Sequence, residues 1–175
     1  MNYEERLKHT LKLAETRFGQ RVDNDRIPSI TFHPGPAQVF FVSQSRVAVR
    51  LSLACQFDYL LGCYQLAHET IHLLSPVDGG RVTALEEGLA TLFSHDYLRE
   101  NIDIDWSPPT DRRYAQAMLL AERFLGPRPD AILRLREQEP VISSITADLI
   151  HQAYPEVPMS LCLPLGSPFC TLHNA

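Results

Sequence analysis

The sequence predicts an α+β fold in which one helix precedes a small antiparallel sheet and the C-terminal half is mainly helical. Three observations predict this class: apolar residues at helical spacing near the N-terminus, three short strand-like runs before residue 52, and helix-period segments after residue 56. The 175 residues fit a single domain, 1–175, that is long enough to enclose its own core.

The first helix is expected over about Asn2 to Arg17. Leu7 and Leu11 lie on one side of it at helical spacing, and Gly19 supplies the end signal. A polar loop then leads to the strand-like region.

The last of the three strand-like runs alternates cleanly, with Val47 and Val49 on one face and Arg46 and Arg50 on the other. Residues 43–45 favour a short hairpin loop between the second and third runs, so we expect an antiparallel sheet. The runs are Ser29–His33, Gln38–Val42 and Arg46–Leu51.

Phe57–Leu74 is apolar nearly all round, which predicts a helix buried in the core that ends at Ser75-Pro76. The next helix, from Thr83, is expected to be amphipathic. The final segment, 155–175, contains four prolines and is predicted to be an irregular tail. The remaining helices are expected at Thr83 to about Arg99, Asp111–Leu125, Asp130–Glu137 and Ser143–Ala153.

The buried helix carries the motif His68-Glu69-Thr70-Ile71-His72. Residues i and i+4 lie one above the other on a helix, so both imidazoles can reach one zinc ion. Glu69 is displaced by about 100° around the axis, where it can touch a water bound to that ion. Two imidazoles on a Lewis acid, with a carboxylate beside the water, indicate hydrolysis with Glu69 as the general base.

A catalytic zinc ion usually takes a third protein ligand, and Glu86 and Glu87 are the candidates. Thr83 followed by Glu86 fits a capping box, which gives Glu86 a structural role and leaves Glu87 free. The hydrophobic face of this helix lies nearer to Glu86, so the residue pattern alone leaves both glutamates open. His95 lies more than two helical turns past Glu87 and is a poor third ligand.

His68-Glu69-x-x-His72 followed by Glu87-Gly88-x-Ala90 resembles the gluzincin class of zinc metallopeptidases. The resemblance implies a zincin-like domain in which His68, His72 and Glu87 bind zinc and Glu69 is the general base. The three-histidine arrangement of metzincins is excluded, because neither Gly nor His follows His72 in register.

The resemblance carries two further expectations. The strand nearest the zinc helix commonly lines the cleft of gluzincin-like enzymes, which implies that Arg46–Leu51 is an edge strand that pairs with an extended peptide. The acidic residue that thermolysin-type enzymes carry four positions after the glutamate ligand is Thr91 here. Support for the zinc histidines must therefore come from another residue.

Hydrolysis of a peptide bond also needs a donor to the tetrahedral oxyanion besides the metal. Tyr114, His151 and Tyr154 are candidates by residue type. Tyr97 and His95 share the helix of Glu87 but sit two to three turns away, so they are poorer candidates.

The predicted function is that of a zinc-dependent metallopeptidase with Zn²⁺ as cofactor and a peptide or protein as substrate. One alternative is a specialised regulatory or toxin-type protease with a single partner substrate. Another is a non-catalytic binding module that retains zinc. The intact Glu69 argues against this module, because a structural zinc site has no use for a carboxylate beside the metal's water.

Composition excludes other classes of protein. The net charge is −5 without a basic block, which argues against nucleic-acid binding, and no run of 18 apolar residues predicts a membrane span. The N-terminus lacks the pattern of a signal peptide, so a cytoplasmic protein is expected. The four cysteines contain no C-x-x-C pair and are expected to be reduced. The oligomeric state is left open.

Overall fold

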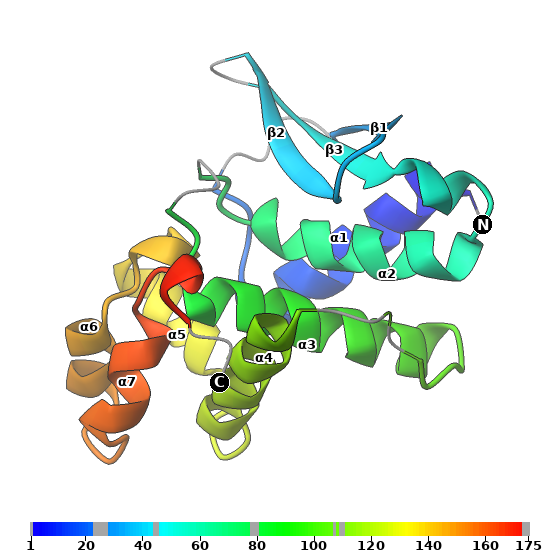
Figure 1. The fold of residues 1–175 in the computed structure, drawn as a ribbon. Helices are drawn as coiled ribbons and strands as arrows, with labels where there is room; N and C mark the ends of the chain where they lie inside the picture. The colour runs from blue at the N-terminus through cyan, green and yellow to red at the C-terminus, as the bar shows by residue number, and fades with distance from the viewer. Residues whose placement is uncertain are drawn as a thin grey trace.

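The computed structural model has the predicted α+β architecture, with a small sheet lying over two helices and the other helices forming the rest of the molecule (Figure 1). The structure describes residues 2–22, 28–43, 46–77, 81–106, 108 and 111–172. The elements in these ranges are α1 (Tyr3–Phe18), β1 (Ser29–His33), β2 (Gln38–Ser43), β3 (Arg46–Ser52), α2 (Tyr59–His72), α3 (Ala84–Asn101), α4 (Arg112–Leu125), α5 (Ala131–Gln138), α6 (Ala147–Ala153) and α7 (Met159–Leu165), with short 3₁₀ turns at Leu53–Gln56, Ile142–Ser144 and Phe169–Thr171.

Helix α1 forms where the sequence predicts it, and a capping box starts it. Oδ1 of Asn2 accepts the backbone N–H of Glu5 at 2.9 Å, and the Asn2 N–H donates to the Glu5 carboxylate at 3.0 Å. Leu7 and Leu11 are buried in a cluster with residues of the sheet and of α2. Helix α1 therefore supports the helix that carries His68 and His72.

The sheet is mixed, so the predicted antiparallel sheet is wrong in one of its two pairings. The strand order is β1-β3-β2, with β3 parallel to β1 and antiparallel to β2. Strand β3 lies in the centre because it is the most buried of the three, with Val49 and Leu51 fully enclosed. Alternation shows which side chains face the core, but it does not show which strands are neighbours. Of the predicted hairpin loop, residues 44 and 45 lie outside the described residues.

Helices α2 and α3 form the centre of the molecule. Asp58 caps α2 by accepting the backbone N–H of Leu61 at 2.9 Å, and most residues of α2 are buried, as predicted. Helix α3 differs from its prediction: it is not amphipathic, because every residue from Ala84 to Ser94 is buried. It is enclosed between α2 and α4. The turn predicted after α2, at residues 78–80, lies outside the described residues.

The segment 155–175 is not an irregular tail, because it contains helix α7. Leu161, Cys162 and Leu165 of this helix are buried in the main core. Pro158 is the N-cap residue, where the lack of an N–H costs nothing, whereas Pro164 lies inside the helix and removes one backbone hydrogen bond near its end. All four cysteines are free thiols, as expected. Among the described helices, none has the length and apolar character needed to cross a membrane.

Candidate metal centre

Helices α2 and α3 bring together the side chains of His68, His72 and Glu87. Nε2 of His68 lies 3.2 Å from Oε2 of Glu87, and Nε2 of His72 lies 3.8 Å from the same oxygen. One potential ligand atom from each residue lies within 4.8 Å of the other two. This group could hold a metal ion, and the described residues contain no other such group.

The two histidines occupy the last two turns of α2, and Glu87 occupies the first turn of α3. The imidazole rings of His68 and His72 are 5.1 Å apart between centroids, as the i, i+4 spacing requires. Because α3 begins at the end of α2 where His72 lies, the carboxylate of Glu87 meets both rings. Glu87, rather than Glu86, therefore belongs to the group that could hold a metal ion.

The close packing of α4 against α3 explains why a glycine, Gly88, follows Glu87. A Cβ atom at this position would lie 2.3 Å from the backbone oxygen of Ala117 in α4, far closer than two such atoms can approach. The missing side chain lets α4 pass directly against α3 beside Glu87. Tyr114, one turn before Ala117, is thereby brought to the metal centre.

Glu86 does not complete the predicted capping box. Oγ1 of Thr83 accepts the Glu86 backbone N–H at 3.4 Å, so half of the box is present. The Glu86 carboxylate, however, accepts a hydrogen bond from Nδ1 of His72 at 2.8 Å and another from the Ser143 hydroxyl. The Thr83 backbone N–H donates to Oγ of Ser143 instead. Glu86 is therefore directed toward His72 rather than toward its own helix end.

Thr91 occupies the position where thermolysin-type enzymes carry an acidic partner, and it does not take over that role. Its hydroxyl donates to the backbone oxygen of Glu87 at 2.9 Å, one turn earlier in the same helix. The carboxylate next to a metal-site histidine comes from Glu86 in this protein, and it contacts the second histidine of the motif.

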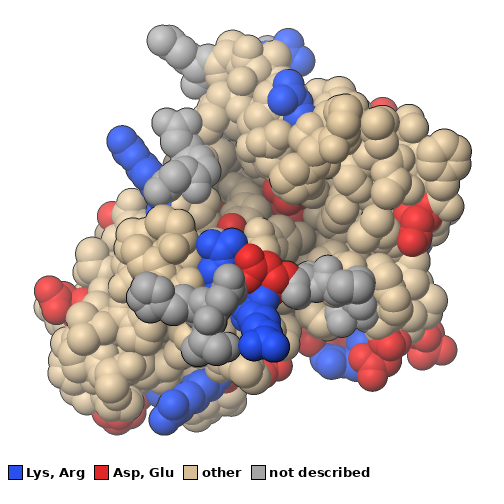
Figure 2. All heavy atoms as spheres, viewed as in Figure 1, with Lys and Arg blue, Asp and Glu red and all other residues tan. Residues whose placement is uncertain are grey.

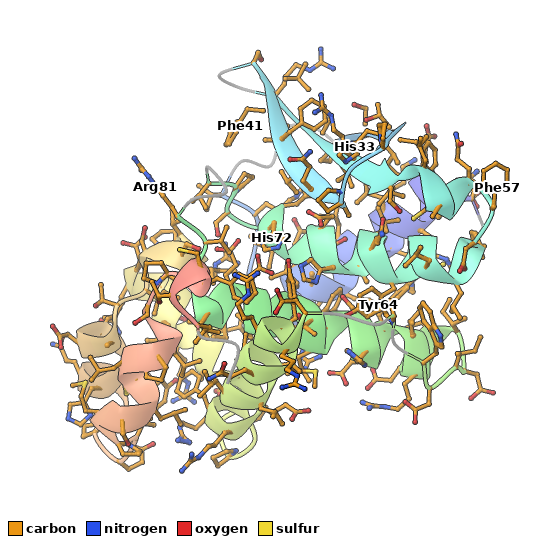
Figure 3. The ribbon with its side chains drawn as sticks, viewed as in Figure 1. His33, Phe41, Phe57, Tyr64, His72 and Arg81 are labelled. Carbon is orange, nitrogen blue, oxygen red and sulfur yellow. The ribbon has the colours of Figure 1, made fainter. Side chains whose placement is uncertain are left out.

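His68, His72 and Glu87, the candidate metal centre, line an open cavity of about 510 Å³ between β2, α2 and the start of α4. Figure 2 shows it as a hollow beneath the sheet, with acidic atoms inside it. Besides the five acidic and histidine residues of the centre, the lining is largely apolar; it includes Pro36, Val39, Leu61, Pro76, Val77 and Pro108. Of the lining residues labelled in Figure 3, Tyr64 lies in the middle part of α2 and His72 lies at its end.

Glu69 is buried beside this centre and lines the cavity. Its carboxylate accepts a hydrogen bond from the backbone of Val39 in β2. Burial raises the pKa of Glu69, while His72 and His68 lower it and Glu87 raises it further. A carboxylate with a raised pKa is a better proton acceptor near neutral pH than an ordinary glutamate.

Two tyrosines reach the cavity. The ring of Tyr114 lies 5.8 Å from that of His68 and stacks on Phe169 at 4.7 Å. Tyr64 packs its ring edge-on against His95 and Trp106. Burial raises the pKa of both hydroxyls to about 12, with Glu87 adding to the effect in each case. Both therefore stay protonated hydrogen-bond donors at neutral pH.

Of the predicted oxyanion donors, the structure brings only Tyr114 to the centre. Nδ1 of His151 lies 3.0 Å from the Val157 backbone oxygen, and Tyr154 packs on Phe124, both away from the cavity lining. The Tyr97 hydroxyl accepts a hydrogen bond from Arg6 of α1 at 2.9 Å. His95 also lies outside the lining.

Tyr64 lines the cavity but was not among the residues that the sequence analysis considered. Its position four residues before His68 places it on the same face of α2, which is the signal that could have identified it.

The three carboxylates around His72 dominate its protonation. Burial lowers the pKa of His72, but Glu87, Glu86 and Glu69 together raise it to about 10. Burial likewise raises the pKa of Glu87, while His72 and His68 lower it, and the net result is a lower pKa. The metal-free centre thus holds a proton on His72 that a metal ion must displace.

Protonation of His72 predicts opposite effects of pH on two quantities, the stability of the metal-free protein and its affinity for a metal ion. The folded-state pKa of His72 lies above its ordinary value of 6.5, so its stabilising contribution is complete below pH 6.5 and is lost as the pH rises toward about 10. Glu69, whose pKa is also raised, changes stability in the same direction. We expect the free energy of unfolding of chelator-treated protein to fall across this range, and metal affinity to rise.

Urea unfolding at a series of pH values, with and without a chelator, measures the first trend. His72→Gln is the control, because it should flatten the pH dependence. Constant stability of the metal-free wild type between pH 6.5 and 10 would contradict the assignment.

A scan against protein-family models finds no match, and searches of curated proteins and of solved structures find no similar chain. The function is therefore argued from the geometry of the site itself.

Proposed function

We propose that this protein is a zinc-dependent peptidase of gluzincin type in which His68, His72 and Glu87 bind the ion and Glu69 is the general base. The observation that carries the proposal is the convergence of two imidazole nitrogens and one carboxylate oxygen in the lining of an accessible cavity that Glu69 also lines. Three protein ligands with one side open to solvent are typical of catalytic rather than structural zinc sites.

The donor set fits zinc better than it fits a harder cation. Two imidazoles and a single carboxylate suit Zn²⁺, whereas Mg²⁺ and Ca²⁺ prefer ligand sets made of oxygen atoms. The proposed ligands come from α2 and α3, whose apolar residues form much of the main core. Three protein ligands leave the fourth position of a tetrahedral zinc ion open.

A zinc ion held by His68, His72 and Glu87 would supply Lewis-acid chemistry at the scissile carbonyl. Glu69 would accept a proton from the attacking water and deliver it to the leaving amine. The apolar lining limits competing water around the scissile bond.

Tyr114 is the proposed donor to the oxyanion. Its ring contacts His68, and its pKa of about 12 keeps the hydroxyl proton available. Tyr114→Phe should lower kcat by roughly 100- to 1000-fold, because it removes one donor that acts in the transition state, and should change KM little. Steady-state hydrolysis of a fluorogenic peptide measures both constants.

Tyr64→Phe is the matched control for Tyr114→Phe, because it removes the same hydroxyl group from the same cavity. The Tyr64 ring packs on His95 and Trp106 rather than on His68, so this variant should keep a kcat near that of the wild type. A greater loss of kcat in Tyr64→Phe than in Tyr114→Phe would assign the oxyanion donor to Tyr64.

The peptide would bind along β2 rather than along Arg46–Leu51. Strand β3 is paired on both sides, whereas β2 has one edge that no described strand covers. Pro36, Gln38 and Val39 line the cavity, and the Val39 backbone points to Glu69. An extended substrate could add to this edge through backbone hydrogen bonds.

The described residues that line the cavity include neither Lys nor Arg. The acidic Asp111 in the lining is already paired with Arg113 at 2.6 Å. The C-terminal carboxylate of a peptide substrate would therefore meet no Lys or Arg side chain in this lining. Its N-terminal amine would meet no unpaired carboxylate outside the metal centre. These features favour cleavage within a chain, next to apolar side chains, over removal of terminal residues.

The test is a comparison of new peptide termini after a proteome digest is incubated with the zinc-loaded wild type or with Glu69→Gln. Many internal cleavages that are present only with the wild type would support a general endopeptidase. Cleavage of one protein alone, in an undigested lysate, would indicate the specialised protease with a single partner substrate. No difference between the two samples, despite bound zinc, would overturn the proposal in favour of a non-catalytic module.

A further inference from the structure

We infer that Glu86 is a positioning residue for the metal centre, which holds His72 with Nδ1 protonated and Nε2 free to bind the ion. The inference rests on the proposed function, because it concerns a ligand of the proposed zinc ion. It assigns to Glu86 a role different from both a third ligand and a helix cap.

The two nitrogens of His72 face different carboxylates. Nδ1 lies 2.8 Å from Oε1 of Glu86, whereas Nε2 lies on the side of Glu87 and His68. A carboxylate oxygen accepts hydrogen bonds, so the contact with Glu86 keeps the proton on Nδ1. The lone pair of Nε2 is then directed toward the ligand group, and the ring cannot rotate without losing this bond.

Glu86 is itself held rigidly. Its side chain is fully buried, and its second oxygen accepts the hydroxyl of Ser143, which in turn accepts the backbone N–H of Thr83 at 3.1 Å. This chain of contacts connects the 3₁₀ turn Ile142–Ser144 with the first turn of α3 and with His72. The charge of Glu86 strengthens the imidazole as a ligand, since a partly negative partner increases the basicity of Nε2.

A purely structural role for Glu86 would satisfy the same hydrogen bonds but would make a different prediction. In that case, loss of the charge would lower the stability of the metal-free protein and leave metal affinity unchanged. In the proposed role, loss of the charge weakens metal binding while the metal-free fold persists. Measurements of metal affinity and metal-free stability therefore separate the two roles.

The experiment measures zinc affinity by competition with a chromophoric chelator for the wild type, Glu86→Gln and Asp96→Asn. Glu86→Gln keeps the shape of the side chain and its acceptor oxygen but removes the charge. It should weaken zinc binding by roughly 10- to 100-fold, as loss of an outer-shell partner does in other metal sites. Asp96→Asn is the matched control: Asp96 is a buried carboxylate ten residues further along α3, paired with Arg17, and its replacement should leave zinc affinity unchanged.

A second readout uses the wild type alone, so it does not depend on the folding of any variant. Long-range ¹H–¹⁵N NMR of the zinc-loaded protein should find the ring proton of His72 on Nδ1. A proton on Nε2, or a zinc affinity of Glu86→Gln within twofold of the wild type, would overturn the inference. A wild type that binds no zinc would instead overturn the proposed function.

Discussion

Glu69→Gln should lower kcat for peptide hydrolysis by roughly 100- to 10,000-fold, the usual contribution of a general base, while the zinc content stays that of the wild type. The variant keeps the volume of the side chain but cannot accept a proton. Because His68, His72 and Glu87 are the proposed ligands, metal binding does not depend on the Glu69 carboxylate. Steady-state kinetics and metal analysis of the same preparation measure both quantities.

The stability of the metal-free Glu69→Gln variant shows whether a loss of activity could result from unfolding. Burial raises the pKa of Glu69, which means that the charged carboxylate is unfavourable in the metal-free fold. The neutral glutamine should therefore leave the melting temperature of the metal-free protein equal to or above that of the wild type. Loss of activity could then not be attributed to unfolding. Glu100→Gln, the same change at an exposed position of α3, is the control and should keep full activity. Retention of wild-type kcat in Glu69→Gln would exclude Glu69 as the base.

His72→Ala and Glu87→Ala should each lose both zinc and activity. Removal of a ligand should weaken zinc binding by more than the roughly 10- to 100-fold expected for an outer-shell partner. Competition with a chelator measures this loss. Added zinc should raise the melting temperature of the wild type but not of these variants, because an ion stabilises only a fold to which it binds.

The positions of Glu86 and Glu87 predict that their replacement affects zinc binding to different degrees. Glu87→Ala should behave as a ligand loss, whereas Glu86→Gln should retain weakened binding. His9→Ala, which changes a half-buried histidine of α1 that contacts Tyr97, should bind zinc as the wild type does. Equal zinc content in Glu87→Ala and the wild type would remove Glu87 from the ligand set.

Local features of the chain were predictable because they depend on neighbouring residues. The first four helices begin close to the predicted positions, since Asn2, Asp58, Thr83 and Asp111 are caps that the first turn itself requires. The helix predicted from Ser143 begins only at Ala147, after a 3₁₀ turn at Ile142–Ser144. The pairing of His68 with His72 follows from helical spacing alone.

Features that depend on how elements pack were predicted less well. The prolines after residue 154 suggested a tail, but the core encloses α7 because Leu161 and Leu165 face other helices. The alternation in Arg46–Leu51 was correct, yet the strand lies in the middle of a mixed sheet. Hydrophobic periodicity reports that a residue is buried and does not report its neighbour.

The sequence by itself therefore determined an α+β chain with a buried helix that presents two histidines one turn apart and a glutamate between them. Only the tertiary structure decided how α3 packs against the helix that carries these histidines. The close contact of Gly88 with Ala117 sets the position of α4 beside α3, and with it the approach of Tyr114. The relative rotation of α2 and α3 turns Glu87 toward both Nε2 atoms and Glu86 toward Nδ1 of His72. Such rotation depends on side-chain packing between helices distant in sequence, which no local pattern encodes.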